Sequence, residues 1–260
     1  MLGAVHDGLG FRFRVSCPDD EAISYVESLL VGLASQYDDG DVVELALAKA
    51  SANDIGALIG TINLRAVEAA AGALLLHAGS VCRTDGASVL LCGASGAGKS
   101  TMTTMLAVRG LGYLTDEAVC IAPDRMRITP FRRPLSVKSG AWPMFPALAP
   151  APGSVAERCS DQQWLVPPHR VEATALPDVP LEPRLLVFPS FKAGQALQIE
   201  RIAPAEAAYL LGSLSVRLHS VRGGGLEALA RLVRRAPAYR VTYGVGELGA
   251  VAVEDLLAAA

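Results

Sequence analysis

The chain has 260 residues, of which 51% are hydrophobic and 19% are charged, and its formal net charge is -3. This composition is typical of a folded globular protein and excludes disorder as the main state of the chain. Lys and Arg together (23) are fewer than Asp and Glu (26), which argues against a nucleic-acid partner.

Several features favour a cytoplasmic protein without a membrane partner. The apolar stretch Ala66–Ala78 contains Glu68 and His77 and is too short to cross about 30 Å of hydrocarbon. Met1–Gly10 has no basic start followed by an apolar run, so we expect no signal peptide. The five cysteines include no Cys-x-x-Cys pair. We expect them to be reduced thiols, buried like small apolar residues.

Apolar periodicity predicts strands that alternate with helices, which indicates an α/β fold. A strand at 11–16 precedes a helix that Asp19 or Asp20 would cap, and a strand at 42–46 precedes a helix that Asn53 or Asp54 would cap. The apolar runs 74–82 and 87–92 are parted by a turn containing Asp-Gly, as in a hairpin. Further strands are expected at 113–115, 118–121, 127–129, 135–138, 185–188, 197–202 and 239–243, and helices at 99–109, 205–214, 226–235 and 247–259.

No hydrophilic linker interrupts the chain. We therefore expect an N-terminal α/β subdomain, residues 1–70, packed on a core formed by residues 71–260. Nine of the sixteen prolines lie between Pro143 and Pro183. This predicts an irregular stretch, which is either a substrate-facing lid or a plain surface meander.

The strongest functional signal is a glycine-rich segment that fits the phosphate-loop pattern G-x-x-x-x-G-K-[ST] between a buried strand and a helix. Glycines let the backbone wrap a phosphate, and the N–H groups of the loop and helix N-terminus point at the anion. Lys99 would reach the β- and γ-phosphates of ATP, and the Ser100 hydroxyl would bind Mg²⁺. The alternative is a glycine turn that only caps a helix. The candidate nucleotide-binding residues are Gly93, Ala94, Ser95, Gly96, Ala97, Gly98, Lys99, Ser100 and Thr101.

Two adjacent acids, Asp116 and Glu117, follow Lys99 by 17 and 18 residues, after a short apolar run. The intervening helix returns the chain to a strand that we expect beside the strand before the loop. One carboxylate would then lie near Mg²⁺ while the other takes a proton from an attacking hydroxyl. A solvated acidic turn is the alternative interpretation.

Three basic residues, Arg132, Arg133 and Lys138, are candidates for gripping the transferred phosphoryl group or the acceptor. The alternative for these three is ordinary surface charge between strands.

Residues 77–121 resemble the HPr kinase/phosphorylase family and its shorter relatives. The resemblance rests on the glycine-rich segment, on Arg109-Gly110 at the helix end, on the acidic pair, and on His77-Ala78-Gly79 one strand upstream. The later segments 187–189 and 202–207 also resemble kinase-like relatives found beside peptide-modifying genes. Some of those relatives phosphorylate a serine of a lasso precursor peptide. The Glu-x-Arg-Gly-x-Gly segment of the full enzymes has no clear counterpart, so HPr is not the expected acceptor.

The resemblance implies a P-loop kinase core of the HPr kinase/phosphoenolpyruvate carboxykinase type, with a mixed sheet and flanking helices. It implies that Asp116 is the catalytic base and that Glu117 replaces the family's second aspartate near Mg²⁺. His77 would polarise the pair or contact phosphate, whereas a lone histidine in an apolar stretch is equally typical of a protein core. Homo-oligomers are usual in the family and are one expectation here.

The sequence thus predicts an ATP- and Mg²⁺-dependent kinase that phosphorylates a serine on a peptide or small protein. Two alternatives stay open at this point. One is a P-loop NTPase or nucleotide sensor that acts on a partner protein, and the other is a kinase for a hydroxyl of a small molecule.

Overall fold

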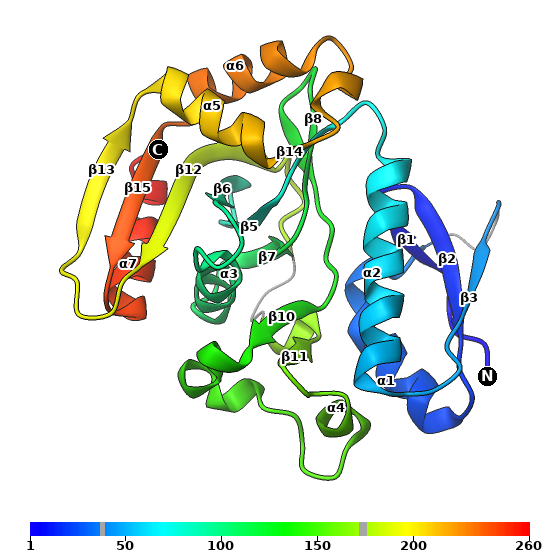
Figure 1. Cartoon of the computed structure of the whole chain (residues 1–260). Coiled ribbons are helices and arrows are strands. Elements are labelled where there is room, and N and C mark those ends of the chain that lie inside the picture. Colours follow the sequence, from blue (N-terminus) through cyan, green and yellow to red (C-terminus); the bar gives the residue numbers. More distant parts are fainter. Residues whose placement is uncertain (37–39, 172–175) are drawn as a thin grey trace. The chain divides into compact units, whose positions relative to one another are not determined.

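The computed structural model describes residues 1–36, 40–171 and 176–260, and it has a mixed α/β fold with several sheets and flanking helices (Figure 1). The chain forms two compact units, Met1–Ala70 with Phe131–Val171, and Ala71–Pro130 with Glu172–Ala260. The first boundary coincides with the expected one after residue 70. Residues 131–171, however, group with the N-terminal residues, so the second unit is interrupted instead of continuous over 71–260. In the described part of the chain, no helix is both long and apolar enough to span a membrane.

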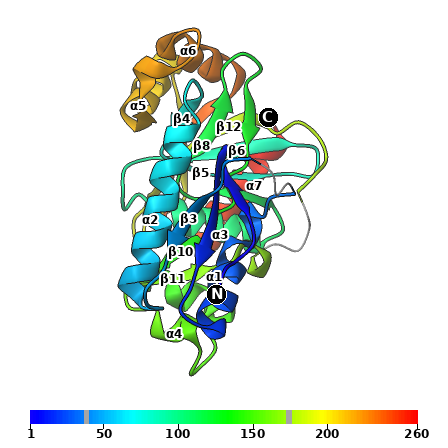
Figure 2. The same cartoon turned by 90° about the vertical axis from the view of Figure 1, so that its right-hand side faces the viewer.

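The first unit is built on a three-stranded sheet with the order β1-β2-β3. Strands β1 (His6–Gly8) and β2 (Phe11–Ser16) form an antiparallel hairpin, and Leu9 and Gly10 at its turn both have positive φ, as a tight hairpin turn requires. Strand β3 (Val43–Ala46) runs parallel to β2. Helix α2 (Ala52–Ala69) packs along this sheet (Figure 2).

The two N-terminal helices have the caps that their sequences favour. Helix α1 (Asp20–Leu30) begins after Asp19, whose carboxylate accepts a hydrogen bond from the N–H of Ala22, as predicted. Helix α2 begins after Ser51, whose hydroxyl accepts from the N–H of Asp54. The expected cap at Asn53 or Asp54 is therefore wrong, because the serine two or three residues upstream satisfies the first turn.

Residues 131–171 add short elements to the first unit. An antiparallel pair, β10 (Leu135–Lys138) and β11 (Gln163–Val166), encloses most of them. Trp142 and Trp164 stack here with their ring centroids 4.8 Å apart. The described part of the proline-rich stretch thus consists mainly of short helical turns on either side of strand β11. These turns are η2 (Ser139–Met144), η3 (Pro146–Leu148), α4 (Val155–Arg158) and η4 (Pro168–Arg170), while η1 (Val31–Leu33) follows α1.

The second unit contains a six-stranded mixed sheet with the order β13-β15-β12-β6-β5-β7. The predicted hairpin is confirmed, because β5 and β6 pair antiparallel across the Arg83–Gly86 turn. Strands β6, β12 and β15 are mutually parallel in the centre. The six strands are β5 (Ala78–Cys82), β6 (Ala87–Cys92), β7 (Gly112–Thr115), β12 (Glu182–Phe191), β13 (Gln198–Ile202) and β15 (Ala238–Tyr243).

A second, four-stranded antiparallel sheet has the order β14-β4-β8-β9. Its apolar side chains share one core with the six-stranded sheet and with helices α5 and α6. Helices α3 and α7 contact strands of the six-stranded sheet and pack on each other. The strands of this sheet are β4 (Leu74–Leu76), β8 (Val119–Ala122), β9 (Arg127–Thr129) and β14 (Ser215–Val216), and the helices of the unit are α3 (Lys99–Val108), α5 (Pro204–Leu214), η5 (Leu218–Ser220), α6 (Gly225–Arg235) and α7 (Gly246–Ala258).

Two short connections of the second unit lead the chain directly from one sheet to the other. His77 separates β4 in the four-stranded sheet from β5 in the six-stranded sheet. Asp116 and Glu117 lie in the connection between β7 in the six-stranded sheet and β8 in the four-stranded sheet. The two crossings are neighbours, because β4 pairs with β8 and β5 pairs with β7. The apolar run 74–82 is therefore two strands instead of one.

Candidate functional site

The glycine-rich segment lies between strand β6, which ends at Cys92, and helix α3, which begins at Lys99. Gly96 and Gly98 have φ values of 85° and 94°. Residues other than glycine rarely adopt this left-handed backbone conformation, so the loop requires glycine at these two positions. The strand, loop and helix thus follow one another as the sequence predicts.

The loop and helix α3 are held close to the strands beside them. A Cβ added at Gly98 would meet the Tyr243 hydroxyl at 3.1 Å, and one added at Gly79 in β5 would collide with the side chain of Thr103. The Thr103 hydroxyl in turn donates a hydrogen bond of 2.9 Å to the carbonyl of Lys99. Small residues therefore let the first turn of α3 approach the sheet.

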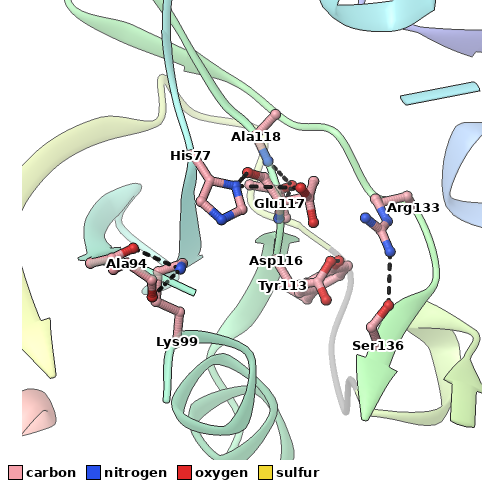
Figure 3. Close-up of polar contacts among 11 residues, drawn as sticks. His77, Ala94, Lys99, Tyr113, Asp116, Glu117, Ala118, Arg133 and Ser136 are labelled. Atoms are coloured by element: carbon pink, nitrogen blue, oxygen red, sulfur yellow. Dashed lines mark hydrogen bonds and ion pairs between the residues drawn. The ribbon is translucent and has the colours of Figure 1, made fainter. Parts of the chain in front are cut away.

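Lys99 lies inside the loop that precedes it. Its side chain is buried, and its Nζ donates hydrogen bonds of 2.7 Å to the carbonyl of Gly93 and 3.0 Å to that of Ala94 (Figure 3). The first N–H groups of an α-helix have no acceptor within the helix, so those at the start of α3 can receive an external anion. An ammonium group and a helix N-terminus at one loop form a site suited to phosphate.

Asp116 is a buried carboxylate. It is 3% exposed, and one of its oxygens accepts a hydrogen bond of 3.1 Å from the hydroxyl of Tyr113. The next turn of chain is fixed by Thr115, whose hydroxyl accepts from the N–H groups of Glu117 and Ala118. A carboxylate held in this way has a defined orientation, as a general base needs.

Glu117 differs from Asp116, because its side chain is partly exposed and contacts His77. The Oε1 of Glu117 lies 3.3 Å from His77 Nδ1, and the carbonyl of Glu117 lies 3.1 Å from the same nitrogen (Figure 3). The two adjacent carboxylates therefore differ in burial, and the predicted division of their roles between Mg²⁺ and the attacking hydroxyl stays a prediction. Such a pair can provide oxygen ligands to a hard cation together with phosphate oxygens. Among the described residues, no three His, Cys, Asp or Glu side chains form a complete metal cluster by themselves.

The loop, His77 and the acidic pair lie at one end of three neighbouring strands. Cys92, before the loop, is opposite Ala78, which follows His77. Thr115, before Asp116, is opposite Ser80 on the same strand. The expectation that β7 lies directly beside β6 is wrong, because β5 lies between them. At a spacing of about 4.8 Å between adjacent strands, β6 and β7, which the loop and the acidic pair follow, are about 10 Å apart with β5 between them.

The predicted substrate residues Arg132, Arg133 and Lys138 belong to the first unit. Arg133 is buried and donates a hydrogen bond of 2.9 Å from its guanidinium to the Ser136 hydroxyl, whereas Lys138 is exposed. Their predicted contact with a substrate stays a prediction, and the residues that the second unit brings together are the loop, His77, Asp116 and Glu117.

Two aromatic residues that the sequence did not single out belong to the site. The hydroxyl of Tyr113 donates a hydrogen bond to Asp116, and the hydroxyl of Tyr243 lies close to Gly98 of the loop. Burial raises the pKa of the Tyr243 hydroxyl to about 12. Each tyrosine lies in an apolar strand and resembles a core residue. The one sequence feature that could have linked either of them to the site is the three-residue spacing between Tyr113 and Asp116.

Comparisons with known proteins give the chain no family. None of the protein-family models matches the sequence, and a search of curated proteins finds no match. The function of the site therefore has to be argued from its own geometry.

Proposed function

We propose that the chain is an ATP-dependent kinase that transfers the γ-phosphoryl group to a serine hydroxyl of a peptide or small protein. The observation that carries this proposal is the placement of the glycine-rich loop and the buried Asp116 at one end of neighbouring strands. The second unit would then be a P-loop kinase core of the type that the HPr kinase/phosphorylase family has, and a lasso precursor peptide is one candidate acceptor.

The donor nucleotide would bind with its phosphates in the loop. The backbone N–H groups of residues 93–101 and the N-terminus of α3 would surround the β-phosphate. Lys99 already has its ammonium group at the loop, where it contacts two carbonyls. On binding, it would exchange these neutral acceptors for charged phosphate oxygens, which make stronger hydrogen bonds.

Mg²⁺ would be held by Ser100 and Glu117 together with the phosphates. A hydroxyl and a carboxylate are the hard oxygen ligands that this ion prefers, and it usually binds through few protein ligands. When bound, the ion would neutralise charge on the phosphate oxygens. His77 would fix the carbonyl and carboxylate of Glu117, which it contacts.

Asp116 would accept the proton of the attacking hydroxyl. Burial and the Tyr113 hydrogen bond hold its carboxylate in one orientation. The acceptor oxygen would form a bond to the γ-phosphorus as the bond to the β–γ bridging oxygen breaks, with ADP as the leaving group. A water molecule in place of the hydroxyl would give free phosphate, which is the NTPase or sensor alternative; a small-molecule hydroxyl is the third possible acceptor.

Transfer of label from γ-labelled ATP tests the proposal. Purified chain is incubated with labelled ATP, Mg²⁺, and serine peptides that include any precursor peptide encoded beside its gene. Asp116→Asn should keep its affinity for ATP and lose transfer by about 100-fold or more, the usual contribution of a general base. Asp124→Asn changes an exposed aspartate on the β8–β9 turn and should transfer normally.

Three results would contradict parts of the proposal. Normal transfer by Asp116→Asn would remove that residue from the mechanism. Labelled phosphate without labelled peptide would favour the NTPase or sensor. Tight ATP binding by Lys99→Ala would show that the loop does not hold the nucleotide.

A further inference from the structure

Phe191 is an exposed aromatic residue beside the glycine-rich loop. It ends strand β12, and its side chain is 52% exposed although most of this strand is buried. A Cβ added at Gly98 would lie 4.0 Å from the Cβ of Phe191. The side chain of Phe191 thus begins close to the last glycine before helix α3, and about half of it is exposed to solvent.

The position of Phe191 is fixed by the strand beside it. Phe191 pairs directly with Tyr243 of β15, and the two rings meet edge to face with centroids 5.8 Å apart. Tyr243 is only 3% exposed. The next N–H, that of Lys192, donates a hydrogen bond of 2.9 Å to the Tyr243 carbonyl. A ring anchored by a buried neighbour keeps its place without needing a ligand.

The order of the strands gives the nucleotide a direction. The acidic pair follows β7 and lies on one side of β6, whereas Phe191 and Tyr243 lie on the other side, at the ends of β12 and β15 (Figure 1). In the proposed reaction the γ-phosphate must face Asp116. The rest of the nucleotide then extends from the loop toward the ends of β12 and β15.

We propose that Phe191 is the stacking platform for the base of the donor nucleotide. This inference rests on the proposed function, because it takes the direction of the nucleotide from the position of Asp116. An exposed aromatic face at this place matches the flat ring of a purine, which stacks on aromatic side chains. Stacking tolerates different bases, so the platform supports both ATP and GTP.

Calorimetric binding of ATP, GTP and inorganic tripolyphosphate separates base from phosphate recognition. In the wild-type chain, ATP and GTP bind more tightly than tripolyphosphate. Phe191→Ala lowers the affinity for ATP and GTP by roughly 5- to 100-fold, as expected for the loss of base–aromatic stacking, and leaves the affinity for tripolyphosphate unchanged. Lys99→Ala lowers the affinity for all three ligands. Tyr209→Ala removes an aromatic side chain that is 80% exposed on α5 and changes none of them.

A second variant gives a fluorescence signal and keeps the proposal testable if the alanine variant folds poorly. Phe191→Trp retains an aromatic face and restores the affinity for ATP. Its additional fluorescence, measured against wild type because Trp142 and Trp164 also emit, changes with ATP and not with tripolyphosphate.

The possible failures are distinguishable. If Phe191→Ala keeps its ATP affinity, or loses ATP and tripolyphosphate equally, the platform is wrong. If the wild-type chain binds ATP no better than tripolyphosphate, the platform fails while the phosphate loop stands. If the wild-type chain binds none of the three probes, the proposed function fails and the platform fails with it.

Discussion

The Nδ1 atom of His77 lies 3.1 Å from the carbonyl oxygen of Glu117 and 3.3 Å from its carboxylate. Both of these partners are hydrogen-bond acceptors, so Nδ1 carries a hydrogen in this arrangement. In the proposed reaction, the other ring nitrogen, Nε2, could act on a ligand. Two roles of His77 can therefore be tested separately, one that positions Glu117 and one toward a ligand.

Two substitutions of His77 separate these roles. Asn offers an amide N–H close to the position of Nδ1, whereas Gln places its amide nearer to Nε2. If His77 only positions Glu117, His77→Asn should keep most of the phosphoryl transfer, and His77→Gln should lower it by about tenfold and raise the Mg²⁺ concentration required, the usual range for a residue that orients a metal ligand. Transfer rates measured over a Mg²⁺ titration give both quantities.

The opposite ranking would assign His77 to the ligand. If His77→Gln keeps most of the transfer while His77→Asn is slow with an unchanged Mg²⁺ requirement, then Nε2 acts on phosphate and Glu117 does not depend on the ring. Full activity of both variants would show that His77 has neither role.

Tyr113→Phe tests the orientation of Asp116. The substitution removes only the hydroxyl that donates to the buried carboxylate. We expect the free energy of unfolding to fall by about 1–3 kcal/mol, the cost of a lost hydrogen bond to a buried charged group. We also expect kcat to fall more than the affinity for ATP, because the nucleotide does not contact Tyr113 in this proposal.

Matched measurements keep this prediction specific. Tyr209→Phe makes the same chemical change on a side chain that is 80% exposed and should alter neither quantity. Loss of stability by Tyr113→Phe with an unchanged kcat would show that the tyrosine supports the fold and has no role in orienting the base.

The local sequence pattern was sufficient to predict the strands and the helix around the loop, but it could not predict which strands pair with one another. The hairpin of β5 and β6 and the start of α3 follow from apolar runs, a turn and glycines, all within about 25 residues. In contrast, β12 pairs with β6 although about 90 residues separate them. Residues 74–82 are mostly apolar and resemble one continuous strand, so the local pattern does not show that the chain changes sheets at His77.

The candidate site could be proposed from the sequence where its residues form an unusual pattern. A glycine-rich segment and two adjacent acids are conspicuous beside the apolar runs that surround them. Tyr113, Phe191 and Tyr243 are not, because an aromatic residue in a strand is typical of a core. Their relation to the site depends on which strands are neighbours, and this is a property of the tertiary fold.

Gly98→Ala tests the backbone of the loop. At a φ of 94° a Cβ costs about 1–2 kcal/mol, and here it would also press on the Tyr243 hydroxyl. We expect a lower thermal midpoint and a loss of ATP affinity.

Gly56→Ala is the matched control, because this exposed glycine in helix α2 has open space around its Cβ position. It should stabilise the chain by about 0.5–1 kcal/mol and leave ATP binding unchanged. Equal behaviour of the two variants would contradict the loop geometry.

Tyr243 makes the stability of the chain sensitive to alkaline pH. Burial raises the pKa of its hydroxyl from 10.0 to about 12, because a phenolate would lose its hydration there. Between these two pH values the unfolded chain releases the proton and the folded chain keeps it. Below pH 10 this group therefore does not reduce the free energy of unfolding. As the pH rises from 10 toward 12, the free energy of unfolding falls by about 1.4 kcal/mol per pH unit because of this group.

Tyr243→Phe removes this contribution while the other titrating groups stay. Urea unfolding followed by circular dichroism should give a constant difference in free energy between wild type and Tyr243→Phe from pH 7 to 9. Above pH 10 the difference should shift in favour of the variant by about 1.4 kcal/mol per pH unit. Tyr209→Phe removes a hydroxyl from a side chain that is 80% exposed and serves as the control for the substitution itself. A difference that stays constant up to pH 11.5 would mean that the Tyr243 hydroxyl is open to water, and the packing of β15 against the loop would be wrong.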